Sequence, residues 1–77
     1  MFVMAAINPE NLRMLMERSG ITPIDLAERC DISLSYMTRI LSGERTLARN
    51  LILRRRIAEN LHVPQFMIEA RDESAVA

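Results

Sequence analysis

Apolar residues between positions 22 and 43 fall on two short helical stripes separated by a polar corner. Each stripe has three apolar residues at helical spacing, Leu26, Ala27 and Cys30 in the first and Met37, Ile40 and Leu41 in the second. Thr22 and Ser33 precede the stripes, and their hydroxyl oxygens can accept hydrogen bonds from the free N–H groups of a first helical turn. The pattern predicts two helices, over about 23–30 and 33–42, joined by a tight turn.

Further helical patterns flank this pair on both sides. The run Asn8-Pro9-Glu10 supplies a cap, a first-turn proline and an early acid, and Gly20 follows the last periodic residue. A later stripe recurs at i, i+4 and i+8 and consists of Leu53, Ile57 and Leu61. The sequence therefore predicts an all-α domain of five helices, over about 8–19, 23–30, 33–42, from 47–51 to 61, and 64–71.

The two ends of the chain lack a clear pattern. Residues 1–7 are apolar and unpatterned, which is compatible with packing on the domain, contact with a partner chain, or disorder. Residues 72–77, DESAVA, are expected to be a frayed tail. The single domain over 1–77 thus divides into an N-terminal arm (1–7), a helical core (8–71) and a tail (72–77).

Composition excludes several classes of protein. Apolar residues make up 49% of the 77 residues, with only two glycines and three prolines, which is typical of a helical protein. The one cysteine excludes an internal disulfide, and no Cys/His spacing indicates a metal site. No acid–base pair or nucleophile–base pair is evident, so we expect neither an enzyme nor a cofactor. Without a membrane-length apolar run or a signal peptide, the protein is expected to be cytoplasmic.

The net charge is zero, but the charges are unevenly distributed along the chain. Residues 29–56 carry seven arginines and two acidic residues, a net charge of +5. Residues 1–28 and 57–77 carry net charges of −2 and −3. A field of this kind can orient a protein on phosphate groups even when the total charge is zero.

The segment 22–45, TPIDLAERCDISLSYMTRILSGER, resembles the lambda-repressor-like (Cro-type) helix-turn-helix family. That family has a small residue where Ala27 stands and a glycine just past the second helix, where Gly43 stands. It has apolar residues at the positions of Leu26, Cys30, Ile32, Met37 and Ile40. The resemblance extends from Leu12 to about Phe66 and implies a compact lambda-repressor-like domain whose second and third helices form the helix-turn-helix.

The resemblance implies that the helix over 33–42 reads the major groove of double-stranded DNA. The implied reading residues are Ser33, Leu34, Ser35, Thr38 and Arg39, with Tyr36 at the flank, where it reaches a phosphate or packs on the preceding helix. These residue types suit the edges of bases. Hydroxyl groups can donate or accept hydrogen bonds, leucine can contact a thymine methyl group, and arginine can donate two hydrogen bonds to guanine. Phosphate contacts are expected at the helix start capped by Thr22 and at Arg45 and Arg49.

The chain departs from the family pattern at several positions. Pro23 stands where a phosphate-binding glutamine is common, and Asp31 stands at a corner that is usually glycine. The loop after Gly43 is slightly longer than is usual. Met16 and Leu41 occupy the positions of a common Arg–Glu ion pair, so we expect these two residues to be buried and in side-chain contact.

The function implied is that of a sequence-specific DNA-binding transcriptional regulator, specifically a repressor. Such modules usually bind as two-fold dimers. We expect a homodimer through Val63, Phe66 and Met67, with the N-terminal arm as an additional candidate. The alternative is an antitoxin or another protein-binding helical module, which neutralises a partner and binds its own promoter. An apolar patch on 1–7 or 63–70 larger than a dimer covers would favour that alternative.

Overall fold

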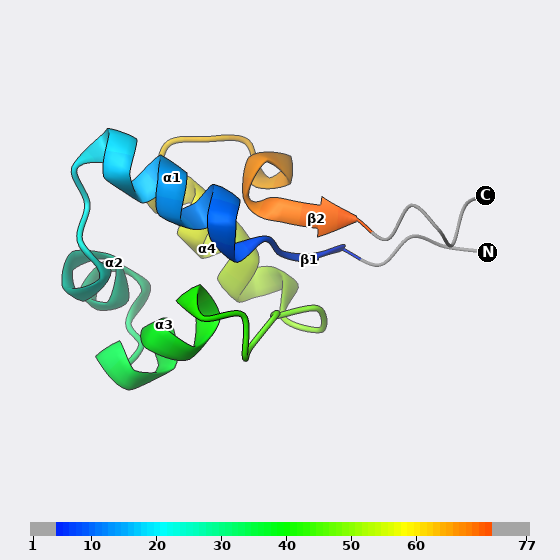
Figure 1. Ribbon diagram of the computed structural model, residues 1–77, viewed down its shortest axis with the longest axis horizontal. Coiled ribbons are helices and arrows are strands. Elements are labelled where there is room, and N and C mark those ends of the chain that lie inside the picture. Colours follow the sequence, from blue (N-terminus) through cyan, green and yellow to red (C-terminus); the bar gives the residue numbers. More distant parts are fainter. Residues whose placement is uncertain (1–4, 72–77) are drawn as a thin grey trace.

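The computed structural model describes residues 5–71. This part of the chain is mostly helical, with one 3-10 helix and a two-stranded sheet (Figure 1). The elements in chain order are β1 (Ala5–Ile7), α1 (Pro9–Ser19), α2 (Pro23–Cys30), α3 (Leu34–Leu41), α4 (Leu51–Asn60), the 3-10 helix η1 (Gln65–Ile68) and β2 (Glu69–Arg71). The predicted helical class is confirmed, whereas the predicted count of five helices is wrong.

Each α-helix begins where the sequence supplies a side-chain cap. The cap oxygens accept backbone hydrogen bonds of 3.0–3.2 Å and belong to Asn8, Thr22, Ser33 and Asn50. These bonds satisfy N–H groups that have no partner within the helix. Gly20 ends α1 in a left-handed conformation with φ of 69°. The beginnings of α1, α2 and α3 thus follow from local sequence.

The helix predicted over 64–71 is wrong, because the chain forms η1 and then β2 there. A helix of so few residues is marginal without extensive packing. β2 instead pairs antiparallel with β1, and Ile7 lies opposite Glu69. The N–H of Asn8 also donates to the carbonyl of Ile68 at 2.8 Å. Residues 5–7 of the arm therefore pack on the domain itself, while residues 1–4 and the tail predicted over 72–77 lie outside the described residues.

The core lies between α1, α2, α3, α4 and η1. Its fully buried side chains come from all five elements and include Leu12, Leu26, Cys30, Met37, Ile40, Ile57 and Ile68. Helix α2 packs on both α3 and α4, and α1 packs on α3 and η1. The sheet lies at the opposite end of the molecule from α2 (Figure 1). The core therefore fixes α3 from one side only and leaves its other side free.

Met16 and Leu41 meet the expectation for burial only in part. Met16 is 4% exposed, whereas Leu41 is half-buried and packs against the edge of the core. Both residues line one hollow of about 320 Å³ between α1 and the end of α3. Full burial of Leu41 was therefore a wrong expectation, because α3 ends at this residue and leaves one side of it open. Their direct contact stays a prediction.

We expect charges at these two positions to be coupled. Met16→Arg alone should lower the free energy of unfolding by about 3 kcal/mol or more, because it leaves a buried charge unpaired. Leu41→Glu alone should cost less, since Leu41 is half-buried. Urea unfolding should show that the double variant loses clearly less than the sum of the two single losses.

Ile52→Arg is the matched control, because Ile52 is an exposed apolar residue of α4 and its replacement should change stability little. Strictly additive losses in the double variant would show that positions 16 and 41 do not interact.

Candidate nucleic-acid interface

The corner between α2 and α3 is closed by a left-handed aspartate. Asp31 has φ of 58° and ψ of 44°, a conformation that aspartate tolerates better than most residues. The following residue, Ile32, donates its N–H to the carbonyl of Ala27 at 3.0 Å. Ala27 is buried, and its small side chain allows α3 to approach α2 closely. The corner predicted at Asp31 therefore forms without glycine.

Helix α3 has a buried inner face and an exposed outer face. Met37 and Ile40 have no exposed surface. The outer face of α3 consists of Leu34, Ser35, Thr38 and Arg39, all of them exposed, and Ser33 is exposed just before them. Leu34 is 45% exposed. The structure thus brings these five sequence-predicted residues together on one surface.

Two hydroxyl groups of this surface are already engaged with the backbone. The Ser33 hydroxyl oxygen accepts from the N–H of Tyr36 at 3.1 Å. The Thr38 hydroxyl donates to the carbonyl of Leu34 at 2.9 Å. A hydroxyl has one proton and two lone pairs, so Thr38 keeps its acceptor capacity and Ser33 keeps its proton. The structure therefore restricts which hydrogen bonds each residue can offer to a base or phosphate.

The loop between α3 and α4 forms a polar hollow beside α3. The hollow has a volume of about 460 Å³ and is lined by Tyr36 and by residues 44–50. Arg45 and Arg49 are exposed at this hollow, and Tyr36 is half-buried between them and the core. The N–H of Arg45 donates to the carbonyl of Arg39 at 3.1 Å, which ties the loop to the end of α3. Tyr36 thus packs inward while it also borders the hollow.

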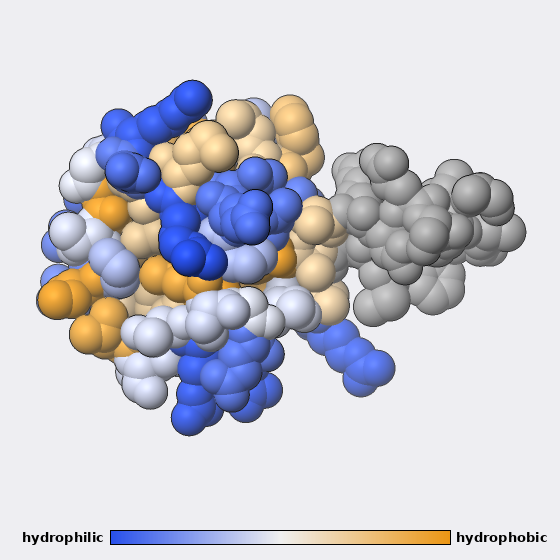
Figure 2. Space-filling view, in the orientation of Figure 1, coloured by the Kyte–Doolittle hydropathy of each residue, from blue (hydrophilic) through white to orange (hydrophobic). Residues whose placement is uncertain are grey.

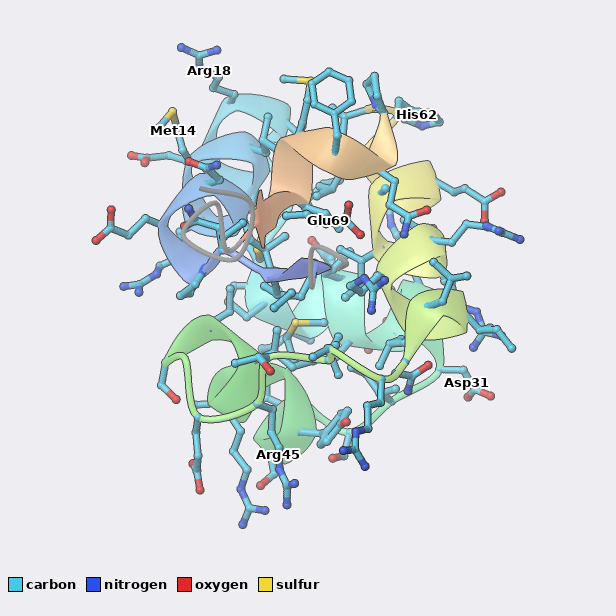
Figure 3. All side chains as sticks on the ribbon, turned by 90° about the vertical axis from the view of Figure 1, so that its right-hand side faces the viewer. Met14, Arg18, Asp31, Arg45, His62 and Glu69 are labelled. Atoms are coloured by element: carbon cyan, nitrogen blue, oxygen red, sulfur yellow. The ribbon has the colours of Figure 1, made fainter. Side chains whose placement is uncertain are left out.

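The arginines of the loop and the outer face of α3 lie at the same edge of the molecule. Figure 2 shows one group of strongly hydrophilic side chains at the lower edge, below the loop after α3, and other groups elsewhere on this face. Figure 3 shows Arg45 pointing away from the body on this side, while Met14 and Arg18 lie at the opposite end. Thr22 is exposed at the start of α2, with its hydroxyl engaged by the N–H of Asp25 at 3.2 Å. Thr22 does not line the hollow and forms a separate part of the candidate surface.

The run Arg54-Arg55-Arg56 divides between interior and surface. Arg54 is buried and forms an ion pair with Glu69, with Nε and Oε2 2.8 Å apart. Arg55 and Arg56 are exposed, and Arg56 donates to the carbonyl of Cys30 at 3.1 Å. Sequence reasoning missed the inward position of Arg54. Arg54 lies three residues before Ile57 and four before Ala58, a spacing that places all three on one face of a helix. This spacing was the signal that could have indicated its inward position.

The described residues hold one buried cysteine and no metal-ligating cluster. Burial raises the pKa of the Cys30 thiol above its ordinary value of 9.0, and the nearby Arg56 offsets this in part. The buried Cys30 therefore stays a neutral thiol at neutral pH. Residues 5–71 contain no cluster of three metal-ligating side chains. None of the helices in this range is long and apolar enough to span a membrane.

Comparison with known proteins agrees with the geometry of α2 and α3. A family model described as a helix-turn-helix domain matches residues 10–65, which is more than half of the 77-residue chain. No curated protein and no solved structure gave a match. The matched range contains the whole of α2, α3 and α4, and all of α1 except Pro9. The chain therefore belongs to the helix-turn-helix domain family of the Cro/lambda-repressor type.

Proposed function

We propose that this protein is a sequence-specific, double-stranded DNA-binding transcriptional repressor that acts in the cytoplasm. Membership of the helix-turn-helix family itself indicates DNA binding and transcription regulation. The observation that carries the finer proposal is the division of α3 into a fully buried inner face and an exposed outer face. A helix held in this way can enter the major groove without losing its own packing.

The outer face of α3 offers a mixture of contacts suited to base edges. Arg39 can donate two hydrogen bonds to guanine, and Leu34 can contact a thymine methyl group. Ser35 can donate or accept, whereas Thr38 offers an acceptor because its proton is bonded within the helix. Such a combination distinguishes base pairs in the major groove, where each pair has its own pattern of donors, acceptors and methyl groups.

Contacts with the DNA backbone would come from both sides of α3. Arg45 and Arg49 border the hollow after α3 and are free to approach phosphates. The start of α2 at Thr22 offers a second contact, although Pro23 provides no N–H there. Acidic Glu44 also lines the hollow, so the positive field is strongest away from that side chain. Contacts of this kind set the position of the protein on the duplex.

Dimerisation would use the apolar surface at the end opposite Arg45. Phe66 is 64% exposed and Met67 38%, and both line a hollow of about 320 Å³ with Met14 and Leu15. Val63 is half-buried and packs against the core, so it offers less area than these residues. We propose that a second copy of the chain covers this surface.

The same apolar surface also favours the second candidate function. An antitoxin or other partner-binding module would use the exposed Phe66 and Met67 to hold a different protein and would still bind DNA through α3. Co-purification of a small basic protein that competes with self-association would support this alternative. Selection of bound sequences from random duplex DNA tests the main proposal, because enrichment of one motif demonstrates specific binding and identifies the operator.

Base readout predicts that Arg39→Ala and Ser35→Ala reduce discrimination between the selected operator and random duplex. Each lost base contact should cost about 1–3 kcal/mol of specific binding. The matched control is Arg29→Ala, an exposed arginine in the last turn of α2 as Arg39 is in α3. Full discrimination in folded Arg39 and Ser35 variants would remove the outer face of α3 from base recognition.

Phosphate contact predicts a different result for Arg45→Ala and Arg49→Ala. Each variant should weaken binding about equally on all sequences and reduce the slope of log K against log salt by about one. Titrations at several salt concentrations measure this slope. Arg55→Ala, an exposed arginine of α4 that lines neither hollow, should leave the slope unchanged, and an unchanged slope in the loop variants would contradict the assignment.

The dimer surface predicts that Phe66→Ser raises the dimer dissociation constant at least about tenfold. Burial of a phenylalanine side chain contributes roughly 1.5–3 kcal/mol, and a two-fold interface buries it twice. Analytical ultracentrifugation measures the effect, with Ile24→Ser as a control at an exposed apolar residue of α2. A wild-type protein that stays monomeric at high concentration, with and without DNA, would exclude the homodimer.

A further inference from the structure

Arg54 joins three parts of the chain from inside the domain. Its side chain is 8% exposed, and its Nε donates to Glu69 Oε2 at 2.8 Å. Its Nη1 donates to the carbonyls of Leu47 and Ala48, at 2.6 and 3.1 Å. One guanidinium group therefore connects α4, the loop after α3 and strand β2.

Further hydrogen bonds support the charged pair. Glu69 Oε2 accepts from both Arg54 and Gln65, the latter at 2.9 Å. Over the described residues no buried side-chain nitrogen or oxygen lacks a hydrogen-bond partner. Loss of either member of the pair would leave the other charge buried and unpaired, which is strongly unfavourable. The pair therefore holds its two chain segments in a defined relation.

The loop needs such support because part of its backbone is in an unfavourable conformation. Leu47 has φ of 56°, a left-handed value that residues with a Cβ rarely adopt. Its carbonyl accepts from the N–H of Asn50 at 3.0 Å and from Arg54, so both of its lone pairs are used. The preceding carbonyl, of Thr46, accepts from the N–H of Ile7 at 2.7 Å. The middle of the loop is thus fixed from α4 and from β1.

We propose that Arg54 is a positioning residue for DNA-backbone binding, through the loop that carries Arg45 and Arg49. These two arginines lie two residues before and two residues after Leu47, the point held by Arg54. The planar guanidinium group of Arg54 reaches Glu69 and two carbonyls at once. A lysine at this position has a single ammonium group and cannot reproduce that arrangement. The inference rests on the proposed DNA-binding function, but the fixation of the loop does not depend on DNA.

Two variants test this role in the full chain. Arg54→Lys keeps the positive charge and loses the planar guanidinium group. Glu69→Gln keeps the shape of the side chain and loses the ion pair. Arg55→Lys is the matched control, because Arg55 is the exposed neighbour on α4. If Arg54→Lys does not fold, the double variant Arg54→Met/Glu69→Gln replaces it, with the same expected results. It removes both charges together, so no buried charge is left unpaired, and it also loses the bonds to the loop carbonyls.

Hydrogen exchange in the DNA-free protein gives the first readout. In Arg54→Lys, exchange of the hydrogen-bonded amides of Arg45 and Asn50 should be accelerated at least about tenfold more than exchange of the amides of Leu12 and Leu26 in α1 and α2. Equal acceleration in the loop and the core would show a purely stabilising role, and no acceleration would show no role. Either result would overturn the proposal.

The salt dependence of DNA binding gives the second readout. The slope of log K against log salt should fall by about one in Arg54→Lys, with discrimination between operator and random duplex retained. An unchanged slope beside a faster-exchanging loop would overturn the positioning role. If the wild-type protein binds no duplex, the proposed function fails, whereas the exchange result still shows whether Arg54 fixes the loop.

Discussion

The burial of Met37 and Ile40 is the constraint on which the rest of the structure depends. An isolated helix as short as α3 is marginal in water, so its stability comes from packing of its inner face. That packing requires a small residue at Ala27 and a left-handed turn at Asp31. Because the inner face is fixed, the outer face of α3 has a single orientation relative to the loop and the domain.

Local signals were enough to predict α1, α2, α3 and most of α4. Capping side chains and helical spacing act over a few residues, so they can be recognised without knowledge of the fold. The two strands could not be predicted in this way. Each has three residues, too few for a recognisable alternation, and each exists only because its partner comes from the other end of the chain.

The candidate site was predictable to a similar extent. The residue types on α3 followed from the match to the helix-turn-helix pattern, and their common exposure agrees with it. The conformation of the loop could not be predicted from the sequence. It depends on a positive φ at Leu47 and on the buried Arg54, whose partner Glu69 lies fifteen positions further along the chain. The helical spacing of Arg54 from Ile57 and Ala58 indicates its face of α4, but its partner Glu69 lies outside that helix and does not follow from local spacing.

The pairing of β1 with β2 has a consequence for the order of folding. Ala5 and Arg71 are partners, so formation of the sheet closes nearly the whole described chain into one loop. The entropy of closing such a loop is lost before its few hydrogen bonds are gained. The helices, which depend on nearer contacts, can form and pack without it. The sheet is therefore expected to be the last element to assemble and the first to open, so local unfolding would begin at the joined ends of the chain and leave the packing of α3 intact.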